Sequence, residues 1–418
     1  MEHEVYAVID IKSFYASCEC AARGLDIFST PLVVADKSRT ANSIVMSVTP
    51  FLKERYGVSN VCRIGDLPDI PDIIYARPRM SYYLEMSAKI VSLFLDFVAE
   101  EDLHVYSVDE SFLRLTPYLK CNQCDADTLV ARIQNAIKSR FGLIATAGLG
   151  PNMFLAKACL DNEGKKRPPF RAYWGQDDVP SKLWKIHPIT KVWGIAGGIS
   201  TRLSRLGIRS MEALAKASDQ LLQKEFGVMG LQLRRLANGI DEASITEPYV
   251  PSEVSLSQGQ VLLRDYKPWE VLLVIKEVVD ELCLRLRKAN VQTRCVSLGI
   301  GYSSTSLGGG FHRQCALNIA SDDPSILFRA IKNLFDQHVE EKMIRNVYVS
   351  FSKLRSYEAP RQLSLLDDEE ALCKRRRLLC ALDAISERYG RNAVLRASAL
   401  TKNSTIIDRH GLIGGHHA

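Results

Sequence analysis

Apolar runs and amphipathic stretches follow one another along the first part of the chain. Residues 5–9 form a continuous apolar run, which predicts a buried strand ending at Asp10, and a helix through Phe14 and Cys20 follows. Helix, hairpin, helix and strand patterns then succeed one another over residues 80–97, 104–115, 126–141 and 143–149. This order predicts a ferredoxin-like β-α-β-β-α-β core, with helices on one face of the sheet and the other face free to meet a substrate.

Two further patterns interrupt or follow this core. Residues 31–36 and 43–48 read as short strands, and the charged helical stretch 51–56 ends at Gly57. We therefore expect a small subdomain inserted into the core. Residues 192–214 contain helix, glycine turn, helix and glycine turn in close succession, a pattern that resembles a helix-hairpin-helix.

A second domain is predicted beyond a linker, so the fold class is α+β throughout. Pro248 and Pro251 mark residues 246–252 as the linker. Strand, helix, strand, strand, helix and strand patterns follow, with helices over 269–288 and 324–338 and a glycine turn over 308–310. Beyond residue 367, acidic residues precede basic ones along a helical apolar pattern, which favours one helix by its macrodipole. Whether this helix docks on the body or on a partner stays open.

Composition narrows the class of protein. A chain of 418 residues with 46% hydrophobic content is too long for one core, and its net charge of +6 suits a polyanion partner. The eleven cysteines follow no disulfide framework, which predicts a reducing, cytoplasmic location. The one C-x-x-C, Cys121 and Cys124, lacks a second pair at zinc spacing, so we expect a solvent-side loop there. No apolar run approaches the ~20 residues of a membrane span.

The candidate chemistry lies in three acidic residues. Asp10 ends a buried strand, while Asp109 and Glu110 lie at the turn of the hairpin, and these strands are neighbours in a ferredoxin-like sheet. Carboxylates that converge in this way repel one another unless cations lie between them. Two Mg²⁺ ions meet that need and perform nucleotidyl transfer. The alternative is a helix cap at Asp10 and a solvated turn at Asp109.

The segments A-V-I-D-I-K-S-F-Y-A-S-C-E (7–19) and Y-S-V-D-E-S-F-L (106–113) match two signature motifs in residue type, order and separation. The chain resembles the Y family of translesion DNA polymerases, of the bacterial ImpB/MucB/SamB-like type that includes the catalytic subunit of SOS polymerase V. The resemblance covers residues 3–366. It implies a low-fidelity, template-dependent DNA polymerase that extends a primer on damaged templates.

The resemblance also implies roles for individual residues. Asp10, Asp109 and Glu110 become the metal ligands, joined by the Ile11 carbonyl, with Asp109 and Glu110 catalytic. Tyr15 falls on the position of the steric gate that excludes a 2′-hydroxyl. Phe14 is then expected beside it beneath the nucleotide.

The domains that the resemblance implies are named after a right hand. They are a palm (1–29 and 78–172), fingers (30–77), a helix-hairpin-helix thumb (173–245), a linker (246–252), a little finger (253–356) and a tail (357–418). In the fingers, Glu54 stands where the family carries a basic residue, so the grip on the triphosphate is expected at Lys53 or Arg55. In the palm, the triphosphate lysine is expected at Lys165, with Lys166 or a shifted loop as alternatives.

Several contacts to larger partners are implied as well. The glycine turn 194–198 is expected to offer backbone N–H groups to a DNA phosphate. The little finger is expected to contact phosphates through basic side chains, with Arg264, Lys267, Arg285, Arg287, Arg294 and Arg313 as candidates. The pentapeptide Gln362 to Leu366 resembles the peptide that bacterial polymerases insert into the sliding clamp, through Gln362, Leu363, Leu365 and Leu366.

The expected partners are therefore primer-template DNA, a dNTP and the sliding clamp, with SOS accessory subunits or a recombinase filament left open. Two other classes of protein stay as alternatives. A nucleotide cyclase on the same palm needs neither a helix-hairpin-helix nor a clamp peptide. A DNA-binding scaffold with a decayed site does not need Asp10, Asp109 and Glu110 intact.

Overall fold

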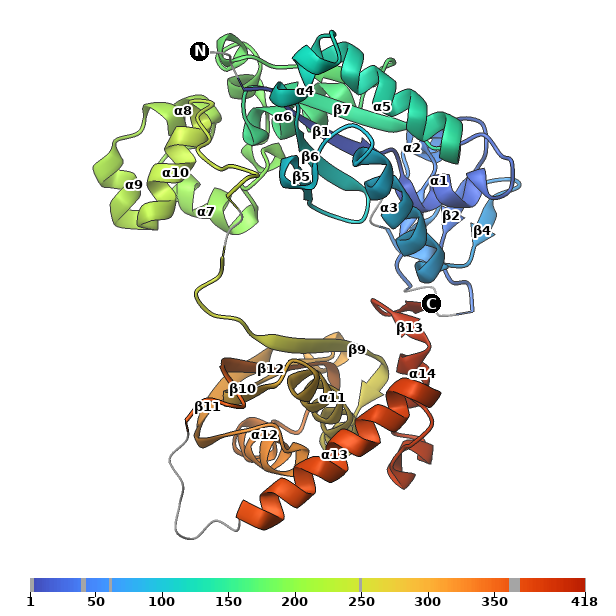
Figure 1. The fold of residues 1–418 in the computed structure, drawn as a ribbon, viewed down its shortest axis with the longest axis vertical. Coiled ribbons are helices and arrows are strands. Elements are labelled where there is room, and N and C mark those ends of the chain that lie inside the picture. The colour runs from blue at the N-terminus through green and yellow to red at the C-terminus, as the bar shows by residue number, and fades with distance from the viewer. Residues whose placement is uncertain (1–3, 39–42, 60–61, 248–249, 361–368, 418) are drawn as a thin grey trace. The chain divides into compact units, whose positions relative to one another are not determined.

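The computed structural model describes residues 4–38, 43–59, 62–247, 250–360 and 369–417 (Figure 1). The chain divides into two compact units between residues 249 and 250, inside the segment expected to be a linker. Each unit has its own sheets and its own core. Within the described ranges no helix combines the length and hydrophobicity of a membrane span.

The first unit is built on a five-stranded sheet of order β5-β6-β1-β7-β8. Its strands are β1 (Tyr6–Ile11), β5 (Leu103–Val105), β6 (Glu110–Arg114), β7 (Ala145–Gly150) and β8 (Arg171–Tyr173). β1 pairs antiparallel with both β6 and β7, and β5 pairs antiparallel with β6. These four strands have the order and connections of the predicted ferredoxin-like core. β8 extends the sheet by parallel pairing with β7.

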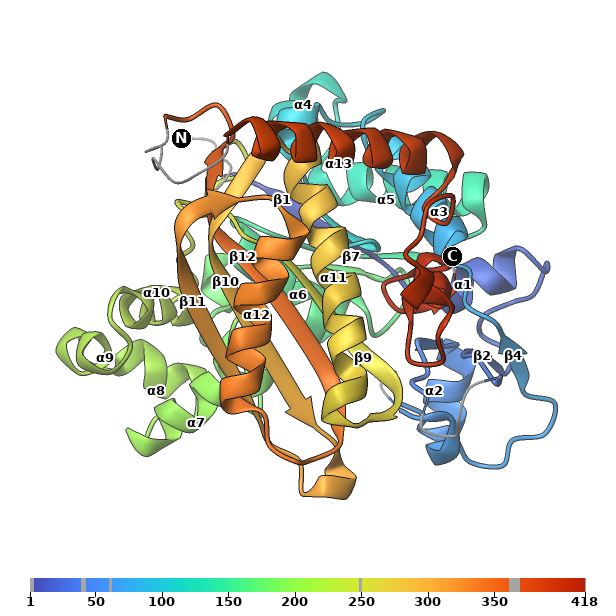
Figure 2. The same cartoon turned by 90° about the horizontal axis from the view of Figure 1, so that it is seen from below.

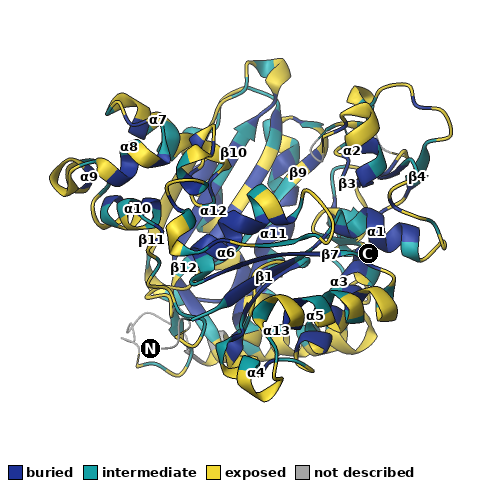
Figure 3. Ribbon diagram, turned by 90° about the horizontal axis from the view of Figure 1, so that it is seen from above, coloured by how far each residue is buried: buried dark blue, intermediate teal, exposed yellow. Residues whose placement is uncertain are grey.

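Helices cover both faces of this sheet, so the expectation of one free face was wrong. One face carries α3 (Met80–Phe94) and α5 (Ala126–Phe141), which pack against each other. On the other face, α6 (Met153–Cys159) packs over β1 and β7 and shares a core with Val8. Alternate strand residues share a face, so Asp10 lies on the α6 side. Burial on both faces makes β1 the dark centre of Figure 3.

Gly148 on β7 allows α6 to approach the sheet this closely. A Cβ at this position would lie 2.2 Å from the carbonyl oxygen of Ala156 on α6. Gly148 opposes Val8 across the sheet, so the close approach occurs on the face that bears Asp10. Any side chain at this position would push α6 away from the sheet face that bears Asp10.

Two smaller assemblies complete the first unit. A three-stranded sheet of order β3-β2-β4 lies with one helix within the segment expected to be the fingers. Its elements are β2 (Leu32–Val34), β3 (Ser47–Val48), α2 (Pro50–Tyr56) and β4 (Ile74–Ala76). Within the segment expected to be the thumb lie α7 (Gly197–Arg205), α8 (Met211–Lys216), α9 (Asp219–Phe226) and α10 (Val228–Ala237). Their core continues into Phe154 and Leu155 of α6, and Gly207 makes the turn between α7 and α8. Ahead of Gly194 the structure has a 3₁₀ turn rather than the predicted helix.

The second unit has a four-stranded antiparallel sheet of order β11-β10-β12-β9. Its strands are β9 (Leu256–Tyr266), β10 (Val291–Tyr302), β11 (Gly310–Ser321) and β12 (Ile344–Ser356). Two helices, α11 (Pro268–Lys288) and α12 (Pro324–His338), lie side by side on one face of it (Figure 2). Val296, Leu298 and Phe351 point into the core beneath them. The predicted order of elements, including the turn at 308–310, is confirmed.

The tail folds onto the helix layer of this second unit. Its long helix is α13 (Glu369–Tyr389), followed by α14 (Ile406–His410) and a hairpin of β13 (Leu412–Ile413) and β14 (His416–His417). Asp383 on α13 pairs with Arg287 at the end of α11 (2.6 Å), and Arg375 pairs with Asp323 at the start of α12. The single helix predicted from charge order is confirmed. Its docking site, left open by the sequence, is the body of the same unit.

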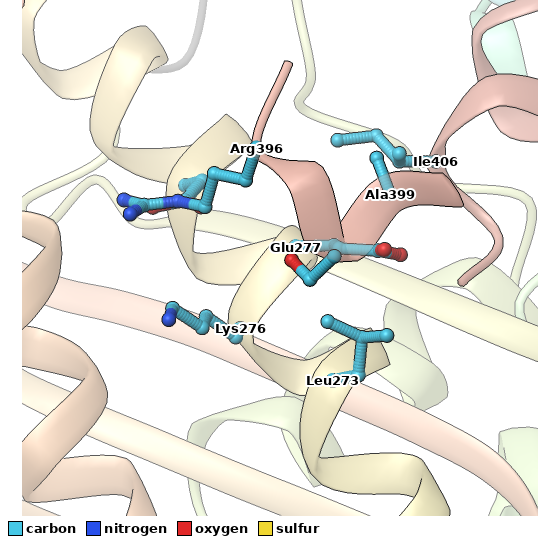
Figure 4. A pocket seen from close by; sticks show the side chains of 8 residues that line it. Leu273, Lys276, Glu277, Arg396, Ala399 and Ile406 are labelled. Carbon is cyan, nitrogen blue, oxygen red and sulfur yellow. The ribbon is translucent and has the colours of Figure 1, made fainter. Parts of the chain in front are cut away.

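A small hollow lies between α11 and the tail (Figure 4). Three of its four charged lining residues have polar partners, since Arg396 pairs with Asp280 (2.8 Å) and Glu277 accepts a hydrogen bond from Ser404 (2.6 Å). The hollow is therefore a packing feature that joins tail to body. Its lining residues are Leu273, Lys276, Glu277, Asp280, Arg396, Ser398, Ala399 and Ile406.

Candidate active site

The three acidic residues meet at the end of β1. Asp10 and Glu110 are directly paired residues of β1 and β6, so their side chains leave the sheet on the same face. The N–H of Ile11 donates to the carbonyl oxygen of Asp109 at 2.9 Å, which holds the turn against the strand end. The hydroxyl of Ser107 donates to Asp109 Oδ1 at 2.7 Å. The backbone thus brings together the acids that the motifs singled out.

Two lysines neutralise these acids. Lys157 on α6 lies 2.8 Å from Glu110 Oε1, and Lys165 lies 3.1 Å from Asp10 Oδ2. Asp161 joins the pair, since its carboxylate lies 3.1 Å from Lys157 and 2.9 Å from Lys165. Acidic and basic groups therefore alternate around the corner.

A π-helical turn places Lys165. Residues Leu160–Gly164 form this turn directly after α6, and the N–H of Lys165 donates to the carbonyl of Leu160, five residues back. Such a turn holds one residue more than an α-helical turn, and π-bulges of this kind concentrate at functional sites. Gly164 is required there, because a Cβ would lie 2.2 Å from the carbonyl oxygen of Ala147. The turn gives a local reason why Lys165, rather than exposed Lys166, reaches Asp10.

Burial raises the pKa values of two carboxyl groups in this corner, those of Asp10 and Glu110. It raises the pKa of Asp10 to about 6, although Lys165 opposes the shift. Burial also raises the pKa of Glu110, against the hydrogen bond from Lys157. For Lys165 itself, burial alone would lower the pKa, and the carboxylates of Asp10 and Asp161 outweigh it and raise the pKa. Partly buried carboxylates so close together need compensating cations.

The donor set of this corner suits divalent metal ions. Carboxylate and carbonyl oxygens are the hard ligands that Mg²⁺ prefers. Among the described residues, Glu110 Oε1 is buried and accepts no well-aligned hydrogen bond, although Lys157 lies 2.8 Å from it, because the hydrogen bond of Lys157 goes to Oε2. The described chain holds no ready-made group of three His, Cys, Asp or Glu ligands. Metal ions at Asp10, Asp109, Glu110 and the Ile11 carbonyl therefore require the lysines to yield their contacts.

Lys53 on α2 reaches this corner, and Arg55 does not. The ammonium of Lys53 donates to the hydroxyl of Ser13 at 2.7 Å, just beyond the end of β1. Burial, followed by the nearby Lys12, lowers the pKa of Lys53 to about 8. Arg55 is exposed and lies over the ring of Phe51. Of the two residues expected as alternatives for holding the triphosphate, only Lys53 is brought to the site.

Tyr15 and Phe14 take different places at the start of α1 (Phe14–Ala21). Phe14 is 2% exposed, and its ring centroid lies 5.5 Å from that of Tyr15, so it lies beside Tyr15 as expected, and its place beneath the nucleotide stays a prediction. Tyr15 is partly exposed, and burial together with the charge of Asp109 raises its pKa. Its ring packs 4.8 Å from that of Tyr83 on α3. Tyr15 is therefore backed by an aromatic ring, and part of its side chain stays exposed.

The residues expected to contact DNA differ in whether they are free to do so. Helix α7 begins at Gly197 without a side-chain cap or an acid in its first turn, so its N–H groups remain available. In the second unit Arg287 was wrongly expected to touch phosphate, since its side chain is only 5% exposed and pairs with Asp383. Arg264 pairs with Glu270 (2.9 Å), and Arg285 donates to the carbonyl of Ser257 (3.0 Å). The other three candidates, Lys267, Arg294 and Arg313, also lie in the second unit, and their contacts with phosphate stay a prediction.

The other sequence predictions have separate outcomes. The clamp residues Gln362, Leu363, Leu365 and Leu366 lie outside the described residues. All eleven cysteines are unpaired; Cys121 is exposed at a helix end and Cys124 half-buried just after it.

Known proteins share both the sequence and this fold. Residues 9–161 match the impB/mucB/samB family, and residues 253–365 match the C-terminal domain of that family. The chain is 38% identical over 409 residues to the putative UV-damage repair protein UvrX of Bacillus subtilis (strain 168), covering 98% of this chain and 96% of that protein. The chain belongs to the impB/mucB/samB family. It is thus a Y-family DNA polymerase, as the two motifs predicted, and the cyclase alternative is set aside.

Full-length relatives support the same assignment to the Y family. DNA polymerase IV 2 of Bacillus subtilis (strain 168) is 29% identical over 420 residues, covering 100% of both chains. A solved Y-family DNA polymerase chimera of Dbh and Dpo4 has a TM-score of 0.68 and 20% identity, covering 84% of this chain and 99% of that chain, and it shows the shared fold. Y-family polymerases use divalent metal ions and bind DNA and dNTPs.

Three residues near the polymerase site were missed by sequence reasoning. Asp161 joins the two lysines, and Lys12 donates to the Lys165 carbonyl at 3.0 Å. Glu19 is fully buried behind Tyr15. Lys12 and Glu19 stand inside the first motif, and Asp161 stands four residues after Lys157, a spacing that places two side chains together on one helix face.

Proposed function

We propose that this Y-family polymerase performs translesion synthesis, extending a primer past damaged template bases with two Mg²⁺ ions at Asp10, Asp109, Glu110 and the Ile11 carbonyl. The observation that carries the proposal is the direct pairing of Asp10 with Glu110 at a strand end, compensated by Lys157 and Lys165. Such an acidic corner gains stability from added cations. Asp109 and Glu110 are the catalytic acids of the proposal.

The side chains of this corner divide the work of nucleotidyl transfer. Two Mg²⁺ ions, when bound, supply the charge that stabilises the attacking and leaving oxygens. Lys53 and Lys165 are the cations proposed to hold the triphosphate, since Lys53 reaches Ser13 just beyond β1 and Lys165 pairs with Asp10 on that strand. Lys157 is the positioning residue for Glu110, and its hydrogen bond opposes the rise that burial causes in the pKa of that carboxylate.

Tyr15 is proposed as the steric gate beneath the sugar. It starts the helix five residues after Asp10, and its ring is backed by Tyr83. Tyr15→Ala removes the ring and none of the acids. The ratio of dNTP to rNTP incorporation efficiencies should fall by about 100-fold, or ~2.7 kcal/mol, while dNTP extension stays measurable. If the variant stays as selective as the parent, Tyr15 is only a packing residue.

Primer extension on matched templates tests the translesion proposal. The parent should extend a primer opposite an undamaged base and opposite an abasic site with efficiencies within about 100-fold of each other, or ~2.7 kcal/mol. The small fingers core, built around seven buried hydrophobic residues, supports a site that checks base-pair shape weakly. Complete arrest at the abasic site, with normal synthesis on undamaged template, would leave a polymerase without translesion activity.

The larger partners belong to the same proposal. The sliding clamp is expected to take Gln362 to Leu366, and DNA is expected at the N-terminus of α7 and along the second unit. The face of that sheet opposite the helices suits a sugar-phosphate backbone, because its small side chains allow close approach. Members of this face include Ser257, Gly259, Ser297, Gly299, Gly301, Ser350 and Ser352. A need for SOS accessory subunits or a recombinase filament stays open, and the cytoplasmic location stays a prediction.

A further inference from the structure

A buried carboxylate lies one helical turn behind Tyr15. Glu19 is 0% exposed and follows Tyr15 by four residues, so both side chains share one face of α1. Its carboxylate accepts hydrogen bonds from Arg79 (2.9 and 3.0 Å) and from the hydroxyl of Tyr83 (2.8 Å), and Arg23 pairs with it too. Burial alone would raise the pKa of Glu19, and these hydrogen bonds outweigh it and lower the pKa. Glu19 is therefore an ionised anchor inside the protein.

Tyr83 connects this anchor to Tyr15. It is fully buried on α3, and its ring centroid lies 4.8 Å from that of Tyr15 at an interplanar angle of 38°. Its hydroxyl meanwhile reaches Glu19, so Tyr83 lies along α1 across one turn, from Tyr15 to Glu19. The side of Tyr15 that faces the interior is thus closed by Tyr83, whereas part of Tyr15 stays exposed.

From this geometry we infer that Tyr83, held in place by Glu19, is a positioning residue that sets how strongly Tyr15 excludes ribonucleotides. The inference rests on the proposed function, in which Tyr15 lies against the sugar. A ring excludes one extra oxygen atom only while it cannot retreat. Close packing against Tyr83 prevents that retreat, and the hydrogen bond to a charged carboxylate keeps Tyr83 itself from turning away.

Substitution of Tyr83 should weaken the discrimination against ribonucleotides and leave dNTP incorporation intact. Tyr83→Leu opens space behind Tyr15, so the ratio of dNTP to rNTP incorporation efficiencies should fall by about 10-fold, or ~1.4 kcal/mol, through faster rNTP incorporation. Tyr83→Phe keeps the ring and removes the hydroxyl, and should lower the ratio by about threefold. Partial unfolding cannot produce this result, because it lowers dNTP and rNTP incorporation alike. Tyr83→Phe also nearly conserves volume, which keeps the test valid if Tyr83→Leu folds poorly.

Tyr82→Ala is the matched control. Tyr82 is the neighbouring aromatic residue, partly exposed, with its ring 6.0 Å from that of Tyr83. Its removal should leave the dNTP to rNTP ratio within about twofold of the parent. An equal loss of selectivity in Tyr82→Ala and Tyr83→Leu would overturn the inference, because it would show a general loosening of α3.

Tyr15→Ala separates this inference from the proposal on which it rests. If Tyr15→Ala relaxes selection and neither Tyr83 variant does, the inference is overturned and the gate stands. If Tyr15→Ala itself stays selective, both are overturned. The double variant Tyr15→Ala/Tyr83→Leu should be no less selective than Tyr15→Ala, because Tyr83 acts through the ring that is already absent. A further additive loss would overturn the inference as well.

Discussion

In the first unit a cluster of acidic and basic side chains lies at the Asp10 end of β1, whereas in the second unit the ion pairs described here lie on the helix layer. Asp10 and Glu110 meet Lys165 and Lys157 where two strands pair. The second unit instead ties α13 to its body through ion pairs, such as that between Arg287 and Asp383. The sheet face opposite those helices carries mainly small, uncharged side chains.

This difference indicates that the first cluster serves catalysis, whereas the second set of ion pairs attaches the tail. A partly buried cluster of acids and lysines lowers the stability of the fold unless every charge is compensated. Such a cluster is therefore expected mainly where its charges interact with a ligand. Charges on the helix layer hold the tail and touch no reacting group. The structure therefore predicts that damage to the first cluster stops synthesis, and that damage to the second changes stability or attachment.

The largest expected effect is at the acidic corner. Glu110→Gln keeps the shape of the side chain and removes the charge that a metal ion needs, so extension should fall by at least ~1,000-fold, about 4 kcal/mol. Asp109→Ala and Asp10→Asn should behave alike. Primer-template binding should stay within about threefold, about 0.7 kcal/mol.

Glu163→Gln is the matched control for Glu110→Gln. Glu163 lies in the π-helical turn after α6 and accepts a hydrogen bond from Trp174 (2.6 Å), which glutamine can still accept. It should keep near-parental activity. Loss of DNA binding in step with activity in Glu110→Gln would point to a structural role for the acids.

The second prediction concerns the ion pair that anchors the tail. Arg287→Ala leaves Asp383 buried without its cation, and should lower the free energy of unfolding of the second unit by about 2–3 kcal/mol. Extension of a short primer-template should stay within about twofold below the melting range. Arg285→Ala, two residues earlier and exposed, should lower the free energy by less than ~1 kcal/mol. Thermal melts of the two variants check the difference, and identical curves would contradict it.

The third prediction concerns attachment to the clamp. Removal of residues 362–366 takes no side chain from either charged cluster, so distributive synthesis on a short template should not change. Stimulation by the sliding clamp should fall by about 10-fold, or ~1.4 kcal/mol of binding. Replacing the same five residues with a Gly/Ser stretch of equal length controls for chain length and should lose the stimulation equally. A deletion variant that responds to the clamp like the parent would refute the pentapeptide assignment.

Strand order and the acidic corner were predictable because they depend on short, regular signals. An apolar run ending at Asp10 and a hairpin at Asp109 suffice to place both acids on neighbouring strands. The partners of these acids were harder to predict. The position of Lys165 depends on a π-helical turn, which follows no apolar period, and on the glycine that makes room for it.

The second unit shows the opposite limit of sequence reasoning. Its elements were predicted in order, yet Arg287 was expected on a DNA-facing surface and is buried under the tail. The sequence identifies a residue as basic without showing which face of the domain its side chain lies on. The partner, Asp383, lies 96 residues away along the chain, and no local pattern links the two.

The smallest expected effect is a pH dependence that isolates Lys53 from the rest of the acidic corner. Burial lowers the pKa of Lys53 to about 8, so its ammonium is present at pH 7 and largely lost at pH 9. If Lys53 holds the triphosphate, kcat/KM for a dNTP should fall through this range, because kcat/KM reports the pKa values of the free enzyme. Lys53→Arg keeps its charge at both values of pH, since the guanidinium pKa lies above 12. It therefore serves as the reference, and it corrects for any general effect of pH on the primer hydroxyl. The ratio of parent to Lys53→Arg should drop by about fivefold between pH 7 and pH 9, or ~1 kcal/mol. A ratio that stays flat would show that Lys53 only packs against Ser13 and that the triphosphate is held by Lys165 without it.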